Sequence, residues 1–179
     1  MDNNSSFDYK DRKYDIVAYD PNWLKMFSAE SEIIKKVFKS DIEIEHIGST
    51  SVPGMEGKPC IDILAIINDI DKVKNYLTEI EKSGYIYRGN VVSKDALLFT
   101  KMEDGATVVN LHFIQEHHPH IFEMLSLRNY LRNNPIEVTK YSALKRELYQ
   151  KHGNNYAEYR KIKDEYMEKL KDRVKKFLE

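Results

Sequence analysis

The chain has 179 residues, a formal net charge of −1 and 41% hydrophobic residues, values typical of a globular domain with one substantial core. The balanced charge argues against nucleic acid or an anionic membrane as a partner bound through bulk charge. No apolar run approaches the roughly 20 residues that a membrane helix needs, and no signal peptide is recognisable. A single cysteine cannot form an internal disulfide, so we expect a cytoplasmic protein.

The N-terminal part of the chain predicts a tail and a helix. Residues 1–13 are polar and predict a flexible tail, which leaves 14–179 as a single domain. Asp20 can cap a helix whose first turn contains Pro21. Four apolar side chains then recur at near-helical spacing and predict a buried stripe: Trp23, Phe27, Ile34 and Phe38.

Two strands of different character follow this helix. The segment "DIEIEHIG" alternates, which predicts a half-buried strand with His46 and Ile47 on opposite faces. The segment "CIDILAII" is almost entirely apolar, which predicts a strand buried on both faces. A helix comes next, with Asp71 as a possible cap and Gly84 as its end.

The second half of the chain begins with strands and ends with helices. "YIYR" is a short strand candidate, and "ALLFTKM" and "TVVNLHFI" flank the Asp-Gly of "EDGA", which predicts a hairpin. Three helices follow, over 120–134, over 135–152 with Asn134 as cap, and over 155–178. This order predicts an α+β fold with a mixed sheet backed by helices and a helical C-terminal part.

The turn between the first two strands, "GSTSVPGMEGKPC", suggests a phosphate site. Gly48 lets a ligand approach the backbone, and Ser49 and Thr50 offer amides and hydroxyls to phosphate oxygens. Lys58 can add positive charge, and Asp62 interrupts an apolar strand 13 positions after Ser49. A buried carboxylate needs a partner or a metal, and Mg²⁺ suits carboxylate and phosphate together. The alternative is an ordinary tight turn, with Asp62 hydrogen-bonded to backbone.

Several segments resemble the GrpB family, from about Val17 to about Lys169: "VAYDPNWLKMF", "IEHIGSTSVPGMEGKPCIDI", "LHF" and "LRNYLRNNP…YSALKREL". The resemblance implies a nucleotidyltransferase-like fold, with a sheet similar to that of polymerase β. In that superfamily a Gly-Ser is followed by two alternating acids on the next strand and a third acid on a later strand. These acids hold two metal ions for nucleotidyl transfer.

The sequence matches this pattern only in part. Gly48, Ser49 and Asp62 agree with it, but Leu64 stands where the second acid is expected. The later strand offers Asn110 and His112 in place of an acid. Three alternatives remain open: one metal on Asp62 with His112 or His46, another acid such as Glu45, or phosphate binding without chemistry.

From these residues we predict metal-dependent nucleotidyl or phosphoryl transfer on an unknown substrate, with Mg²⁺ or Mn²⁺ as cofactor. The alternative is a catalytically degenerate module that binds a nucleotide or another phosphorylated small molecule. Asp62 and His112 are the candidate catalytic residues, and Asp62 is also the metal ligand. The candidate substrate-binding residues are His46, Gly48, Ser49, Thr50, Lys58, Arg128 and Lys145.

Overall fold

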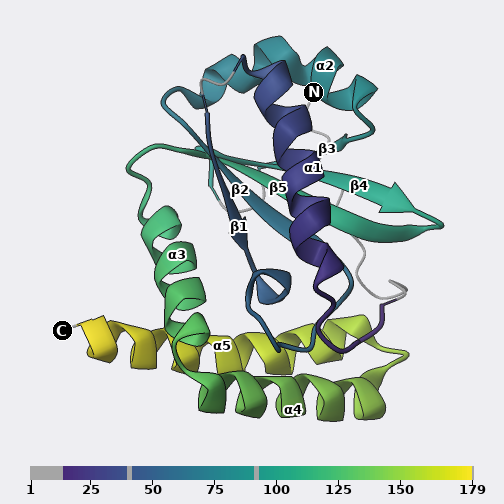
Figure 1. Cartoon of the computed structure of the whole chain (residues 1–179), viewed down its shortest axis with the longest axis vertical. Coiled ribbons are helices and arrows are strands. Elements are labelled where there is room, and N and C mark those ends of the chain that lie inside the picture. Colours follow the sequence, from purple (N-terminus) through teal and green to yellow (C-terminus); the bar gives the residue numbers. More distant parts are fainter. Residues whose placement is uncertain (1–13, 40–41, 91–92, 179) are drawn as a thin grey trace.

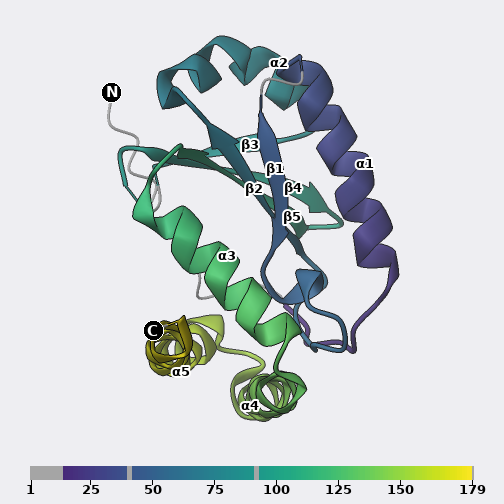
Figure 2. The same ribbon diagram turned by 60° about the vertical axis from the view of Figure 1, so that its left-hand side comes forward.

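The apolar patterns of the chain build a five-stranded sheet with helices on both faces (Figures 1 and 2). The computed structural model describes residues 14–39, 42–90 and 93–178, so the predicted tail over 1–13 lies outside the described residues. The elements follow one another as α1 (Asn22–Val37), β1 (Glu43–Ile47), η1 (Ser49–Ser51), β2 (Ile61–Ile67), η2 (Ile70–Tyr76), α2 (Leu77–Lys82), β3 (Ile86–Gly89), β4 (Ala96–Glu103), β5 (Ala106–Gln115), α3 (Pro119–Arg132), α4 (Pro135–His152) and α5 (Tyr156–Leu178).

The sheet is mixed, as predicted, with strand order β1-β2-β5-β4-β3. β2 and β5 are parallel, and the other neighbouring pairs are antiparallel. The predicted hairpin joins β4 to β5, with Asp104 and Gly105 both at positive φ (49° and 77°), as a two-residue hairpin turn requires. β2 and β5 therefore form the centre of the sheet, where continuous apolar sequence is stable.

Helices cover the two faces of the sheet in different ways. α1 and the η2–α2 segment cover one face, which we call the α1 face, and α3 lies against the other, the α3 face (Figure 2). The α1 face carries the largest apolar cluster, including Ile63, Phe99 and Phe113, all with no exposed surface. α4 and α5 lie side by side beyond the end of the sheet near η1 (Figure 1).

The predicted helix positions are confirmed, with differences at their ends. The Asp20 carboxylate accepts a hydrogen bond from the Asn22 amide at 2.9 Å, as a capping residue does. The prediction of Asp71 as a cap is wrong, because the Asp69 carboxylate accepts from the Asp71 amide at 3.1 Å and opens a 3₁₀ segment ahead of α2. Asn134 precedes α4, but its side chain donates to the Tyr130 carbonyl at 2.7 Å and does not cap the helix.

α5 buries aromatic and apolar side chains along one side. Tyr159, Leu170 and Val174 are at most 4% exposed, whereas Phe177 is 62% exposed. No helix within 14–39, 42–90 or 93–178 combines the length and apolar character needed to cross a lipid bilayer.

Candidate functional site

Strand pairing brings Asp62 beside the Gly-Ser turn on the α3 face of the sheet. Asp62 lies opposite Ile47 on β1 and opposite Asn110 on β5. The Asn110 amide donates to Asp62 Oδ1 at 2.7 Å, so a neutral side chain partners this carboxylate. His112 lies two residues along the same face of β5.

Gly48 packs directly against Asp62. Its φ is 71°, and a Cβ added there would lie 2.2 Å from Asp62 Oδ2. Both the backbone conformation and the space therefore require glycine at this position. The Gly-Ser segment therefore begins against the Asp62 carboxylate.

A cavity of about 320 Å³ lies between this edge of the sheet and the helices α3, α4 and α5. Gly48, Ser49 and His112 contribute to its wall. Its charged lining side chains are Lys58, Asp62, Arg128, Lys145 and Lys163. Four cationic groups and one carboxylate thus face one space, which favours an anionic ligand.

Lys145 is the most deeply buried of these cations. Only 2% of the residue is exposed, and its ammonium donates to Ser49 Oγ at 2.9 Å and to the Glu56 carbonyl. The ammonium also lies 4.4 Å from the centre of the Tyr141 ring. Burial, together with the nearby charge of Lys163, lowers the pKa of Lys145 to about 7. A lysine perturbed in this way at a cavity wall is a typical mark of a functional site.

Two further lysines reach the cavity from different elements. Lys58, in the segment before β2, donates to the Tyr156 hydroxyl at 2.7 Å. Lys163, on α5, pairs with Asp164 at 2.8 Å, and 28% of its side chain is exposed. Both ammonium groups therefore retain donors that a ligand can use.

Two contacts with β1 fix the Arg128 side chain. Its guanidinium forms an ion pair with Glu45 and donates to the His46 carbonyl at 3.0 Å. Only 10% of its side chain is exposed. These contacts join α3 to β1, so Arg128 positions the cavity wall as well as contributing charge. The Glu45 carboxylate is therefore already paired with Arg128.

His46 and Thr50 lie away from the cavity. His46 points to the α1 face, where its ring stacks on Phe27 with centroids 4.6 Å apart and Nε2 lies 3.0 Å from Thr50 Oγ1. Thr50 has no exposed surface. The strand alternation explains this, because His46 and Ile47 must point to opposite faces. The structure thus does not bring these two predicted substrate-binding side chains to the cavity.

Burial also sets the protonation of the histidines. It lowers the pKa of His46 to about 4, and in the described residues Nδ1 of this ring is a buried atom without a hydrogen-bond partner. Burial likewise lowers the pKa of His112, an effect that outweighs the nearby Asp62 carboxylate. Both rings are therefore neutral near pH 7.

The donor set does not fit a two-metal centre. Leu64 has no exposed surface and packs with Ile47 and Ile114 in an apolar cluster. Asn110, opposite Asp62, contributes an amide that donates to the carboxylate. Within the described part of the chain, no group of three or more His, Cys, Asp or Glu side chains is placed to hold a metal. Asp62 is thus the carboxylate that the cavity offers.

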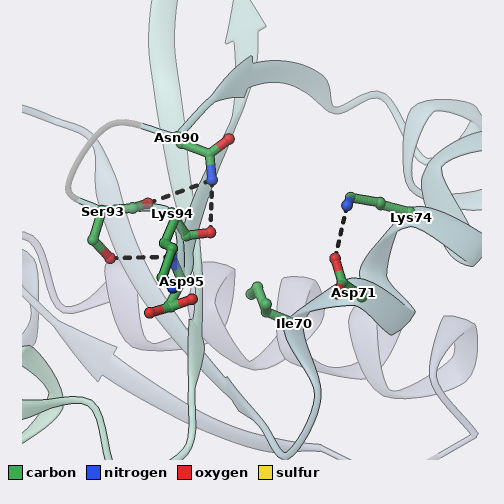
Figure 3. A pocket seen from close by; sticks show the side chains of 7 residues that line it. All are labelled: Ile70, Asp71, Lys74, Asn90, Ser93, Lys94 and Asp95. Atoms are coloured by element: carbon green, nitrogen blue, oxygen red, sulfur yellow. Dashed lines mark hydrogen bonds and ion pairs between the residues drawn. The ribbon is translucent and has the colours of Figure 1, made fainter.

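A second, more open cavity of about 700 Å³ lies near the opposite end of β2 (Figure 3). Its charged groups include Asp71 and Lys74, which pair with each other at 2.7 Å. The Asn90 amide donates to the carbonyls of Ser93 and Lys94. Asp71 and Lys74 balance each other, whereas the lining of the cavity at Lys145 has an excess of positive charge. The latter is the better candidate site.

Comparison with known proteins agrees with the resemblance of the turn and the later helices. The sequence model of the GrpB protein family matches residues 13–173. The chain belongs to the GrpB family. It is 32% identical over 170 residues to the UPF0157 protein YqkA of Bacillus subtilis, covering 94% of this chain and 49% of that protein. The chain thus spans about half the length of this relative.

Solved structures place this GrpB-family chain in a wider fold group. A crystal structure of conserved protein GrpB from Enterococcus faecalis matches with a TM-score of 0.85 and 34% identity, covering 92% of this chain and 100% of that one. The Cid1 poly(U) polymerase matches with a TM-score of 0.52 and 9% identity, over 75% of this chain and 44% of that one. The fold is therefore α+β and nucleotidyltransferase-like, as predicted.

Sequence reasoning missed Lys163, Tyr141 and Tyr159 at the cavity. A signal for Lys163 was available, since it lies four residues after Tyr159 and hence on the same face of the predicted helix. What the pattern could not show is that this face of α5 borders a cavity and not a closed core.

Proposed function

We propose that the cavity binds the phosphate groups of a nucleotide or of another phosphorylated small molecule. The observation that carries this proposal is the convergence of Lys58, Lys145 and Lys163 on the space beside Ser49, from three different elements. Point charges of this kind are common phosphate ligands. The nucleotidyltransferase-like fold supports the same ligand class, since the Cid1 neighbour is described with MgGTP bound.

In this proposal the positive charge comes from side chains. The Lys145 amine is fixed by protein contacts and not by water, because it is buried and donates hydrogen bonds to Ser49 Oγ and the Glu56 carbonyl. Because the pKa of Lys145 is lowered to about 7, its protonated and neutral forms are both populated near neutral pH.

Metal-dependent nucleotidyl or phosphoryl transfer is the second candidate, and Asp62 is the observation that favours it. The carboxylate lies at the cavity wall beside Gly48, where the fold group carries an acid. A Mg²⁺ or Mn²⁺ ion would then be held by Asp62 and by the ligand. Leu64 and Asn110 weigh against this candidate, so we place binding without a two-metal centre first.

The substitution Asp62→Asn separates the two candidates because they predict opposite signs. If lysines bind the phosphate, losing the carboxylate removes repulsion, and affinity rises. If a metal ion on Asp62 is required, affinity falls and depends on added Mn²⁺.

The experiment is a thermal-shift titration with the four nucleoside triphosphates, coenzyme A and inorganic pyrophosphate, each with and without Mn²⁺. A ligand at 100 times its Kd stabilises the folded state by about 2.7 kcal/mol. We expect a metal-independent shift that is lost in Lys145→Met and kept in Lys140→Met, an exposed lysine on the same helix. Absence of any shift in the wild-type protein would overturn the proposal.

A further inference from the structure

The contact between Ser49 and Lys145 has the geometry of a nucleophile and its base. Ser49 Oγ lies 2.9 Å from Lys145 Nζ, and Ser49 is half-buried in the wall of the cavity. The pair comes from elements far apart in the chain, η1 and α4, so the contact is made by the tertiary fold. A side chain at position 57 would disturb the contact between Ser49 and Lys145, because a Cβ on Gly57 would lie 2.8 Å from Ser49 Cβ.

Lys145 lacks the partner that a buried ammonium normally has. In the described parts of the chain no carboxylate forms an ion pair with it, and the nearby Glu56 carboxylate pairs with Arg146 instead. A buried lysine without a counter-ion is stable mainly as the neutral amine. The neutral amine can donate one hydrogen to the Glu56 carbonyl and still offer its lone pair to the Ser49 hydroxyl.

We infer that Ser49 is a nucleophile and that Lys145 is the general base that activates it toward a phosphorus electrophile in the cavity. The Ser49 Oγ–P bond forms while the bond from phosphorus to its leaving group breaks. The leaving group departs with the electron pair, and the hydroxyl proton moves to Lys145 Nζ. Ser49 then carries the transferred group as a phosphate ester.

The rest of the cavity suits this step. Lys58 and Lys163 face the same space and neutralise charge on the phosphoryl oxygens. Burial lowers the pKa of His112, so its neutral ring adds no positive charge to the cavity. This step needs no reactant other than the phosphorylated ligand. It rests on the proposed function, which supplies that ligand.

The test uses a fluorophosphonate probe on the intact protein, with the labelled residue identified by peptide mass spectrometry. Ser49 attack on this probe breaks the P–F bond and releases fluoride. We expect labelling at Ser49 whose rate rises with pH to a plateau, with a midpoint near pH 7. Lys145→Met should lower the rate about 100-fold, the lower end of what a general base contributes.

The controls separate this inference from phosphate binding and from misfolding. Lys140→Met should label like the wild type, and Ser49→Ala should abolish labelling while its thermal unfolding stays cooperative. Wild-type protein that does not label at Ser49, or a rate equal to that of Lys145→Met, would overturn the inference even if phosphate still shifts the melting temperature. Labelling without any phosphate shift would overturn the proposed function and leave the nucleophile–base pair standing.

Discussion

A buried base lies on each side of the sheet, His46 on one and Lys145 on the other, and their surroundings differ. On the α1 face, His46 lies between the Phe27 ring and Thr50, in contact with the largest apolar cluster of the protein. On the α3 face, Lys145 lies at a cavity lined by other charges. Both groups have lowered pKa values because both are desolvated.

The difference lies in what a ligand can reach. His46 is closed in by side chains, so its neutral state contributes to the core alone. The cost of burying Lys145 can be offset by an anion in the adjoining cavity. A perturbed pKa thus indicates function on one face and packing on the other, and the cavity is the feature that distinguishes them.

The largest expected effect is the pH dependence contributed by Lys145. The unfolded chain holds this proton up to about pH 10.5, whereas the folded protein loses it near pH 7. Between these values the unfolded state binds more protons, so stability rises with pH, by a total on the order of 5 kcal/mol. Urea denaturation from pH 6 to pH 9 should show part of this rise, roughly 3 kcal/mol, in the wild type and a flatter profile in Lys145→Met.

Lys140→Met, on the exposed side of α4, is the matched control for this profile. Its pH dependence should follow that of the wild type. An equal rise in Lys145→Met and the wild type would mean that Lys145 is protonated throughout, and would contradict the contrast between the two faces.

The second largest effect concerns Gly48, which directly follows β1. Gly48→Ala forces a Cβ to 2.2 Å from Asp62 Oδ2 and also strains a φ of 71°, whereas Gly54, with a φ of 78°, has nothing within 4 Å. We expect Gly48→Ala to cost about 3 kcal/mol or more and Gly54→Ala about 1 kcal/mol, the backbone contribution alone. Denaturant midpoints measure both, and equal costs would show that the contact with Asp62 carries no weight.

The smallest effect is the acid sensitivity contributed by His46. The unfolded ring takes up its proton near pH 6.5 and the folded ring near pH 4, so stability is lost as pH falls through this window. We expect a loss on the order of 2 kcal/mol, removed in His46→Phe, which retains a ring to stack on Phe27. Measured unfolding free energies at pH 4.5 and 7 test this. A loss as large in His46→Phe would assign the acid sensitivity to other groups.

The sequence by itself determined much of this arrangement. The alternation of β1 placed His46 and Ile47 on opposite faces, and the Asp-Gly pair placed the hairpin. Gly48, Ser49 and Asp62 stood out in the sequence as a turn and an acid on consecutive strands, and the antiparallel pairing of β1 with β2 brings them together. Local period and turn chemistry suffice for these features, since each depends on residues close in the chain.

Only the tertiary structure decided which charges meet. Ser49 and Lys145 are 96 positions apart, and neither local sequence pattern predicts that α4 packs beside the Gly-Ser turn. The same holds for Lys163. Helical spacing fixes the face on which a lysine lies, whereas the packing of α3, α4 and α5 against the sheet decides whether that face meets water, core or a cavity.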